Sequence, residues 1–224
     1  MLNQNNPKTA VLIGSTGLIG NHLLNILLAN ESYSQIILIS KRSANVVHPK
    51  VVEHLINFDK INQIEHLIHG DDFYCVIGTT IKKAGSKEAF RKVDYIYPLM
   101  FAQISKRNNF KKFLLVSSIG ADEHSNNFYL KVKGELESQI KALNFQCSFI
   151  FRPSLLLGNR NEFRFGEKLA TIIMPFFSFL LMGKLKKYKA IKAKTVANAM
   201  CLFAQKDCSG FNIIESNEML NLDN

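Results

Sequence analysis

Apolar and polar residues follow two alternating patterns along the chain. Short apolar runs predict strands over 10–13, 35–40, 51–56, 74–77, 113–117 and 147–151, with a late strand near 211–214. Apolar residues at helical spacing predict helices over 18–29, 60–69, 87–108, 127–143 and 195–205. Pro98 lies inside the 87–108 helix, which we therefore expect to start late or to kink. This alternation predicts an α/β fold, a doubly wound parallel sheet with helices on both faces.

The sequence GSTGLIG, residues 14–20, lies between the first strand and the first helix. This arrangement is typical of a dinucleotide-binding turn, in which the helix N-terminus holds the pyrophosphate. Gly14 permits the tight turn, Gly17 lets the backbone approach the phosphates, and Gly20 allows the helix to pack closely on the sheet. The GxxGxxG spacing leaves an ordinary strand-to-helix turn as the alternative.

Residues 40–43, SKRS, follow the second strand. A carboxylate at this point would accept hydrogen bonds from the adenosine ribose hydroxyls and mark NAD. No acid is present in the segment, and Lys41 and Arg42 offer cations for a 2′-phosphate, which favours NADP. The alternative is that both are solvent-facing loop residues.

Two further segments complete the predicted cofactor side. Asp59 follows the third strand and is expected either to accept from the adenine amino group or to cap the helix that begins at Lys60. The fourth strand closes on Ile77, Gly78 and Thr79, where a small residue lets the backbone lie against the cofactor.

Tyr129 and Lys133 are four residues apart in the 127–143 helix, so both side chains lie on one helix face. An ammonium beside a phenol favours the phenolate, which would lower the phenol pKa from about 10. Tyr129 could then protonate a carbonyl that receives hydride, and Lys133 could hydrogen-bond the nicotinamide ribose. Ser117 and Ser118 end the fifth strand, where either hydroxyl could polarise the substrate oxygen. A half-buried tyrosine beside a solvated lysine is the alternative, which the nearby serines and glycine turn disfavour.

The 224 residues and their 47% hydrophobic content predict a single domain with a short C-terminal appendage. The four cysteines, Cys75, Cys147, Cys201 and Cys208, form no CxxC pair and lie in or beside apolar segments. We therefore interpret them as reduced core residues, which fits a cytoplasmic location. The first residues show no charged segment followed by a long apolar stretch, so no secretory signal is expected.

The formal net charge is +10, and six of the lysines fall within 184–194. A polyanion site is one interpretation, but Tyr188 is the only interleaved aromatic residue. A solvated surface strip is therefore favoured, and no specific nucleic acid is expected as a partner.

The preceding stretch 169–183 is apolar and free of charged residues. Its 15 residues contain a central proline and are too few to span a bilayer, which takes about 20. Three interpretations remain: a helix buried on the sheet, a substrate lid, or an interfacial anchor assisted by the lysines. We therefore treat 165–194 as a candidate lid or interfacial segment with at most peripheral membrane contact.

His66 and His69 have a spacing that suits a metal on one helix face, but no third ligand is evident, so no metal site is expected. The oligomeric state stays open between monomer and homodimer. The apolar stripe of the 127–143 helix could pair with its copy.

Several ordered motifs resemble a known group of proteins. GSTGLIG, the Ser117-Ser118 strand end and Tyr129-x-x-x-Lys133 resemble the short-chain dehydrogenase/reductase superfamily in its atypical or extended branch. Further segments more narrowly resemble the Tat-interacting-protein oxidoreductase family, namely 78–80, 83–86, 93–94, 116–122, 129–135 and 151–153. This similarity runs from about residue 10 to about residue 164 and implies a Rossmann-type, NAD(P)-binding fold.

The resemblance implies that NADPH binds along the glycine turn, the 2′-phosphate site and the nicotinamide side. The residues that it assigns to the cofactor are Thr16, Gly17, Leu18, Ile19, Lys41, Arg42, Ile77, Gly78, Lys133, Pro153, Leu156 and Arg164. Tyr129 is the implied proton acceptor.

We therefore expect an NADPH-dependent oxidoreductase that reduces the carbonyl of a small-molecule substrate at a Ser-Tyr-Lys site. The family includes proteins known better as regulators or binding partners. The alternative is thus an NADPH-sensing protein with a protein partner and little or no turnover. Membrane-peripheral work on a lipidic substrate is a third option.

Overall fold

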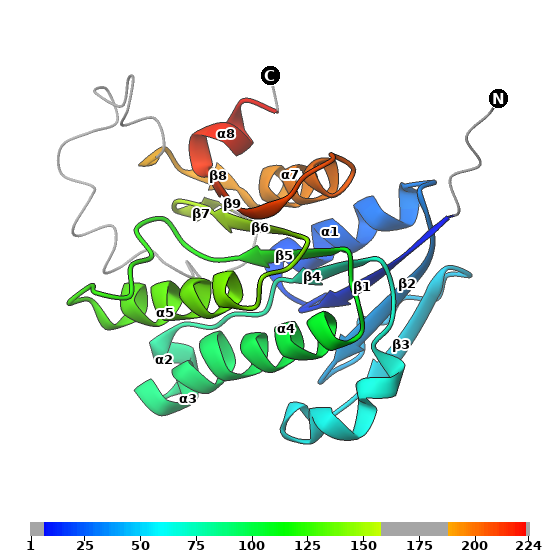
Figure 1. Cartoon of the computed structure of the whole chain (residues 1–224), viewed down its shortest axis with the longest axis horizontal. Coiled ribbons are helices and arrows are strands. Elements are labelled where there is room, and N and C mark those ends of the chain that lie inside the picture. Colours follow the sequence, from blue (N-terminus) through cyan, green and yellow to red (C-terminus); the bar gives the residue numbers. More distant parts are fainter. Residues whose placement is uncertain (1–6, 158–187, 223–224) are drawn as a thin grey trace.

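Seven parallel strands form one sheet in the computed structural model, which describes residues 7–157 and 188–222 (Figure 1). The strand order is β3-β2-β1-β4-β5-β6-β9, so the chain starts near the middle and winds outward in both directions. The strands are β1 (Lys8–Ile13), β2 (Tyr33–Ser40), β3 (Val51–Leu55), β4 (Asp72–Cys75), β5 (Lys112–Val116), β6 (Cys147–Arg152) and β9 (Gly210–Glu215). The predicted doubly wound α/β fold, a single Rossmann-like domain, is confirmed.

Helices cover both faces of the sheet (Figure 1). The larger ones are α1 (Leu18–Ala29), the 3-10 helix η1 (Phe58–Leu67), α4 (Tyr97–Arg107), α5 (Phe128–Ala142) and α7 (Ala193–Ala204). Leu23 of α1 and Met200 of α7 share one buried cluster with the sheet, and Phe101 of α4 and Leu136 of α5 belong to a second. Because helices bury both faces of the sheet, the strand sequences are continuous apolar runs in which apolar and polar residues do not alternate.

The observed elements match the predicted ones closely where the apolar pattern is long. The helix predicted over 18–29 is α1, with both ends as expected. The fourth strand covers 72–75, two residues earlier than predicted, and the 60–69 helix is the 3-10 helix η1. Four short elements have too few residues to show a periodicity: α2 (Ile81–Ala84), α8 (Ser216–Leu220) and the paired strands β7 (Leu156–Leu157) and β8 (Ile191–Lys192).

Pro98 changes the helix predicted over 87–108, as expected. The region consists of α3 (Lys87–Arg91), a π-helix η2 (Lys92–Ile96) and α4 in direct succession. Proline has no N–H, so Pro98 cannot donate to the carbonyl of Asp94 four residues earlier. Tyr97 instead donates to the carbonyl of Lys92 five residues earlier, which is the π-helical pattern. Asp94 lies within this wide turn and is buried.

The apolar stripe of α5 packs on the sheet of its own chain. Val132, Leu136 and Ile140 are fully buried, and the last two lie in the cluster beneath α5 and α4. The stripe is therefore covered, and the suggestion that it pairs with a second copy is wrong.

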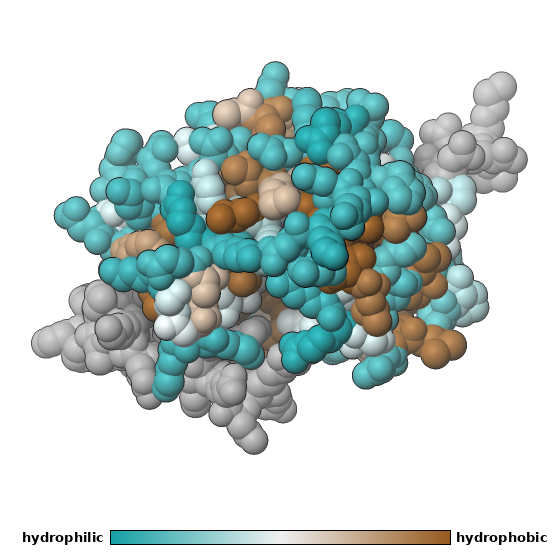
Figure 2. All heavy atoms as spheres, turned by 90° about the horizontal axis from the view of Figure 1, so that it is seen from below, coloured by the Kyte–Doolittle hydropathy of each residue, from teal (hydrophilic) through white to brown (hydrophobic). Residues whose placement is uncertain are grey.

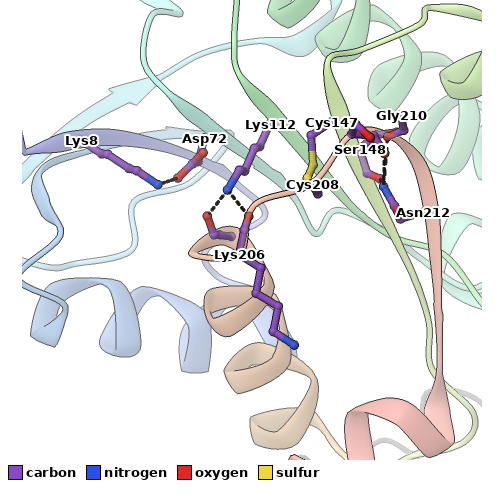
Figure 3. The surroundings of a disulfide bond; sticks show 11 residues. Lys8, Asp72, Lys112, Cys147, Ser148, Lys206, Cys208, Gly210 and Asn212 are labelled. Atoms are coloured by element: carbon purple, nitrogen blue, oxygen red, sulfur yellow. Dashed lines mark hydrogen bonds and ion pairs between the residues drawn. A yellow bond between two sulfur atoms is a disulfide. The ribbon is translucent and has the colours of Figure 1, made fainter. Parts of the chain in front are cut away.

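Cys147 and Cys208 form a disulfide (Figure 3), so the expectation that all four cysteines are reduced is wrong. Cys147 begins β6 and pairs across the sheet with Gly210, which begins β9 two residues after Cys208. Parallel pairing of these strands therefore brings the two sulfur atoms together, although 61 residues separate them in the sequence. Cys75 and Cys201 are unbridged and buried, as predicted.

The candidate lid lies mostly outside the described residues. Of segment 165–194 only 188–194 is described, where Ile191 is buried and three lysines are exposed. The apolar stretch 169–183 lies wholly outside. Within the described ranges no helix is both long and apolar enough to cross a membrane.

The face that Figure 2 shows, seen from below relative to Figure 1, is mostly hydrophilic. Exposed large apolar side chains include Val47, Val52 and Leu55 in or just before the edge strand β3, and Ile213 in the opposite edge strand β9. Scattered apolar side chains of this kind are normal on a protein surface and indicate no particular partner.

Candidate active site

A cavity of about 460 Å³ lies beyond the carboxyl ends of the central strands. Doubly wound sheets bind their ligands at this edge. Most residues that the sequence singled out line it, namely Gly14, Thr16, Gly17, Leu18, Ile19, Lys41, Arg42, Ile77, Gly78, Thr79, Ser117, Tyr129, Lys133 and Leu156. One cavity therefore joins the glycine turn, the two cations and the Tyr-Lys pair.

The glycine turn has the close contacts that its sequence predicts. Gly14 has a φ of +91°, and a Cβ there would lie 2.8 Å from the backbone nitrogen of Ile77. A Cβ on Gly20 would lie 2.0 Å from the carbonyl oxygen of Gly14, so α1 packs on the turn itself. Gly17 is the N-cap of α1, and no side chain among the described residues caps this end. The first N–H groups of α1 are thus available to an anion.

Lys41 and Arg42 lie at the far wall of the cavity, directly after β2. The Lys41 ammonium sits 4.5 Å from the ring centroid of Tyr97 and 5.1 Å from that of Phe58. Both cations are exposed to solvent and line the cavity at once. This placement suits the recognition of a mobile, doubly charged phosphate by two cationic side chains.

Asp59 does not line the cavity. Its carboxylate accepts from the hydroxyl of Tyr97 at 2.8 Å and pairs with the ammonium of Lys92 at 2.7 Å. The hydrogen bonds from Lys92 and Tyr97 hold the Asp59 pKa below its ordinary value. Asn57 provides the helix cap by accepting from the backbone N–H of Asp59, so the capping interpretation of Asp59 is wrong. Its contact with an adenine stays a prediction.

Lys133 is buried between an acid and a phenol. Its ammonium lies 2.8 Å from a carboxylate oxygen of Asp94, with side chains 5% and 1% exposed. The other oxygen of Asp94 accepts from the backbone N–H of Thr79 at 2.8 Å. Burial lowers the Lys133 pKa, but Asp94 and Tyr129 outweigh it, so the pKa is raised above its ordinary value. Lys133 is therefore a charged ammonium at neutral pH.

The phenol of Tyr129 is not activated in the way that the sequence suggested. Burial raises the pKa of Tyr129 to about 12, against the lowering effects of Lys133 and of a hydrogen bond from Ser118. Asp94 raises the same pKa because its negative charge offsets that of Lys133. The expectation that Lys133 brings this phenol closer to physiological pH is thus wrong for the protein alone.

The structure gives the two adjacent serines different hydrogen-bond partners. The hydroxyl of Ser117 donates to Glu137 at 2.5 Å, and Glu137 in turn accepts from Arg152. Ser118 is the serine that hydrogen-bonds Tyr129. A small second cavity is lined by both serines, Tyr129, Leu156 and Pro153 among others. Gly20 lies beneath the turn outside the cavity lining, and Arg164 lies outside the described residues.

Sequence reasoning missed Asp94 as a site residue. The signal that could have found it is Pro98, because a proline leaves the carbonyl four positions earlier without its helical partner and so marks a distorted turn. Tyr97, Thr80 and Lys83 also line the cavity without having been predicted. Their positions depend on how η2 and α2 fold back over the sheet, which no periodicity encodes.

Metal ligation finds no support in the part of the chain that the structure describes. No group of three or more His, Cys, Asp or Glu side chains there could hold a metal ion. His66 and His69 are both exposed.

Several curated relatives match most of the chain, whereas no family model matches it. The chain is 34% identical to protein HTATIP2 of Rattus norvegicus over 220 residues, which cover 96% of this chain and 89% of that protein. It is 36% identical over 162 residues to the mitochondrial protein FMP52 of Candida glabrata, covering 71% of this chain and 68% of that protein.

Solved structures with the same fold include MoeE5 in complex with UDP-glucose and NAD. It superposes with a TM-score of 0.67 at 12% identity over 96% of this chain and 80% of that one. A short chain dehydrogenase family protein from Francisella tularensis gives a TM-score of 0.67 at 14% identity over 95% and 99% of the two chains. At such low identity these likenesses show a shared Rossmann-like fold alone.

The expected cytoplasmic location is contradicted by these relatives. Several fungal relatives are named as mitochondrial proteins, among them those of Candida glabrata, Debaryomyces hansenii and Candida albicans. The expectation rested on reading the cysteines as reduced, and Cys147 and Cys208 also depart from that interpretation.

Proposed function

Because this chain belongs to the HTATIP2 family of Tat-interacting-protein oxidoreductases, we propose that it is an NADPH-dependent oxidoreductase that reduces a carbonyl compound. The observation that carries the proposal is that Tyr129, Lys133 and the glycine turn line one cavity. A phosphate cradle next to a proton donor is the combination that hydride transfer to a carbonyl needs. Small-molecule ligands named in the structures of the same fold, UDP-glucose and NAD, support a nucleotide site.

The cavity fits a dinucleotide at its glycine turn. A side chain at Gly14 would collide with the backbone at Ile77, and the uncapped start of α1 offers N–H donors to a pyrophosphate. Lys41 and Arg42 would hold a 2′-phosphate, while Gly78 leaves room beside Lys133. When bound there, reduced nicotinamide supplies the hydride.

The residues at the other end of the cavity would handle the proton. Tyr129 donates the proton of its hydroxyl to the carbonyl oxygen as this oxygen gains negative charge. Ser118, which hydrogen-bonds Tyr129, holds the same oxygen in place. Ser117 lines the same cavity but has its hydroxyl committed to Glu137, so Ser118 is the serine that we assign to the substrate oxygen. Leu156 and Ala89 supply apolar wall next to these groups.

A panel of aldehydes and ketones tests this proposal when it is followed by the absorbance of NADPH. We expect turnover of at least one carbonyl compound by the wild type and none by Tyr129→Phe. Binding of NADPH without turnover of any carbonyl would support the second candidate below instead.

An NADPH-sensing binding protein is the second candidate. The observation that favours it is the similarity to HTATIP2, because the family resemblance implies proteins known better as regulators or binding partners. In that case the cavity binds the same cofactor, and a partner protein recognises the occupied state. Partner binding that depends on NADPH but not on Tyr129 would distinguish this function from catalysis.

The names of the fungal relatives support a mitochondrial location for this chain. Cell fractionation with matrix and cytosolic marker proteins tests it directly. Recovery of the chain in the cytosolic fraction alone would contradict it.

A further inference from the structure

The Asp94–Lys133 pair is the most deeply buried charged pair at the cavity. The two charged groups are 2.8 Å apart, and both side chains are almost completely buried at the wall of the cavity. Asp94 is further held by the Thr79 N–H, within the segment that connects β4 to α2. A buried charge that is fixed on both sides cannot turn away to find another partner.

Four groups from four parts of the fold face the Tyr129 hydroxyl or its neighbour Lys133. Lys133 comes from α5, Asp94 from η2, Ser118 from the end of β5, and Cys75 from the end of β4. The Cys75 thiol is neutral, because burial raises its pKa to about 12. Lys133 and Asp94 are thus the only charged groups among these four, and Asp94 offsets part of the effect that Lys133 has on the Tyr129 pKa.

This offset matters because the Lys133 ammonium without Asp94 would stabilise a phenolate beside it. The Asp94 carboxylate lies 2.8 Å from the Lys133 ammonium and therefore reduces the attraction that Lys133 can offer a phenolate at the half-buried Tyr129. The raised pKa of Tyr129 agrees with this geometry.

We propose that Asp94 is a positioning residue that holds Lys133 and offsets its charge, so that the site keeps Tyr129 as a neutral phenol that can donate its proton. This inference rests on the proposed function. In the reduction the carbonyl carbon accepts the hydride, the electron pair of the C=O π bond moves to the oxygen, and this oxygen takes the Tyr129 proton. The step leaves a phenolate on Tyr129, which regains a proton from water in the cavity before the next turnover.

The first test measures Tyr129 alone in the cofactor-free protein. The tyrosinate absorbance of the wild type minus that of Tyr129→Phe isolates this phenol during a pH titration. We expect no difference up to about pH 10, where an ordinary tyrosine is half ionised. A tyrosinate signal at lower pH would overturn the proposal. The test needs neither substrate nor NADPH, so its failure is distinct from failure of the proposed function.

The second test removes the carboxylate. In Asp94→Asn the charge of Lys133 is left uncompensated, and the Tyr129 titration should move down by at least about one pH unit. The high-pH loss of kcat for reduction should move down with it. The matched control is Asp72→Asn, which alters a buried carboxylate at the other end of the sheet and should leave the Tyr129 titration unchanged. An unchanged titration in Asp94→Asn would contradict the proposal.

A double variant keeps the test decisive if Asp94→Asn does not fold. Asp94→Asn with Lys133→Met removes both charges and leaves no unpaired ion in the interior. Its Tyr129 should again titrate above about pH 10, because burial alone then acts on the phenol. Titration well below that pH in the double variant would show that another group controls Tyr129, which overturns the role of Asp94.

Discussion

Two buried carboxylates, Asp72 and Asp94, lie at opposite ends of the same central strand, β4. Asp72 begins the strand, and Asp94 lies beyond its end, where it accepts from the N–H of Thr79. Each is 1% exposed, and each has a lysine and a tyrosine close by. The two groups therefore contain the same residue types around equally buried carboxylates.

The Asp72 group is built differently. Tyr33 donates directly to the carboxylate at 2.6 Å and also shares a hydrogen bond of 2.7 Å with Tyr74. Lys8 approaches Asp72 at 3.3 Å with a side chain 29% exposed. Burial raises the pKa of Asp72 in spite of these partners. In this group the phenol thus donates directly to the carboxylate, and the lysine lies partly exposed at its edge.

What distinguishes the two groups is access to the cavity. In the Asp94 group the lysine stands between acid and phenol, and Asp94, Lys133 and Tyr129 all line the cavity. Asp72, Tyr33 and Lys8 do not line it. The residue types and the burial of the carboxylates alone would make both groups candidate sites. Only the Asp94 group lies at the cavity with the glycine turn.

The largest effect is expected for the two tyrosines. Tyr129→Phe removes the proton donor, so carbonyl reduction should fall by about 10² to 10⁴ or more, while affinity for NADPH changes little. Tyr33→Phe should leave reduction unchanged and lower stability by about 1.5–3 kcal/mol, since it removes a hydrogen bond to a carboxylate. Steady-state rates and urea unfolding measure the two effects. Loss of activity in Tyr33→Phe would contradict the distinction between the Asp72 and Asp94 groups.

Next in size is the effect of the two lysines on stability. Lys133→Met removes the ammonium that compensates the charge of the buried Asp94 carboxylate, which should cost about 3–5 kcal/mol and also weaken NADPH binding. Lys8→Met breaks a partly exposed pair and should cost only about 1 kcal/mol or less. Chemical denaturation of both variants tests this order. Equal costs would show that the two ion pairs are energetically alike.

The Cys147–Cys208 disulfide is expected to affect stability without affecting the cavity. Cys147 and Cys208 close a loop of 61 residues, so reduction should destabilise the chain by about 2–4 kcal/mol. The bond joins β6 to the segment before β9, at the amino ends of these strands and away from the cavity (Figure 3). NADPH affinity measured with and without a dithiol reductant should therefore be the same. Cys201→Ser serves as the control, because this buried thiol is unbridged.

The smallest effect is expected at the cationic wall of the cavity. A charge-assisted hydrogen bond to a 2′-phosphate contributes about 1.5–3 kcal/mol, so NADPH should bind about tenfold or more tightly than NADH. Arg42→Ala should remove most of this preference without changing stability, because the side chain is exposed. Calorimetric titration with both cofactors gives the ratio. Equal affinities in the wild type would contradict the assignment of Lys41 and Arg42.

The cofactor half of the site was the most predictable part of the molecule. A short apolar strand, the glycine turn and the amphipathic α1 are local features, and they determine where the cavity begins. Tyr129 and Lys133 were equally readable, since helical spacing places them on one face.

The remaining features depend on contacts between distant segments. The Cys147–Cys208 bond follows from the pairing of β6 with β9, and no spacing rule predicts it. Asp94 reaches Lys133 because a π turn before Pro98 lies against α5. The direction of the Tyr129 pKa shift could not be derived from Lys133 alone, because burial outweighs the lowering effect of Lys133 and the unpredicted Asp94 raises the pKa further.

Titration of the wild-type chain with NADPH by calorimetry tests the central claim most directly, that this cavity is a cofactor site. We expect saturable NADPH binding that is retained in Tyr33→Phe and weakened in Lys133→Met. Absence of saturable binding to the folded, disulfide-intact chain would contradict it.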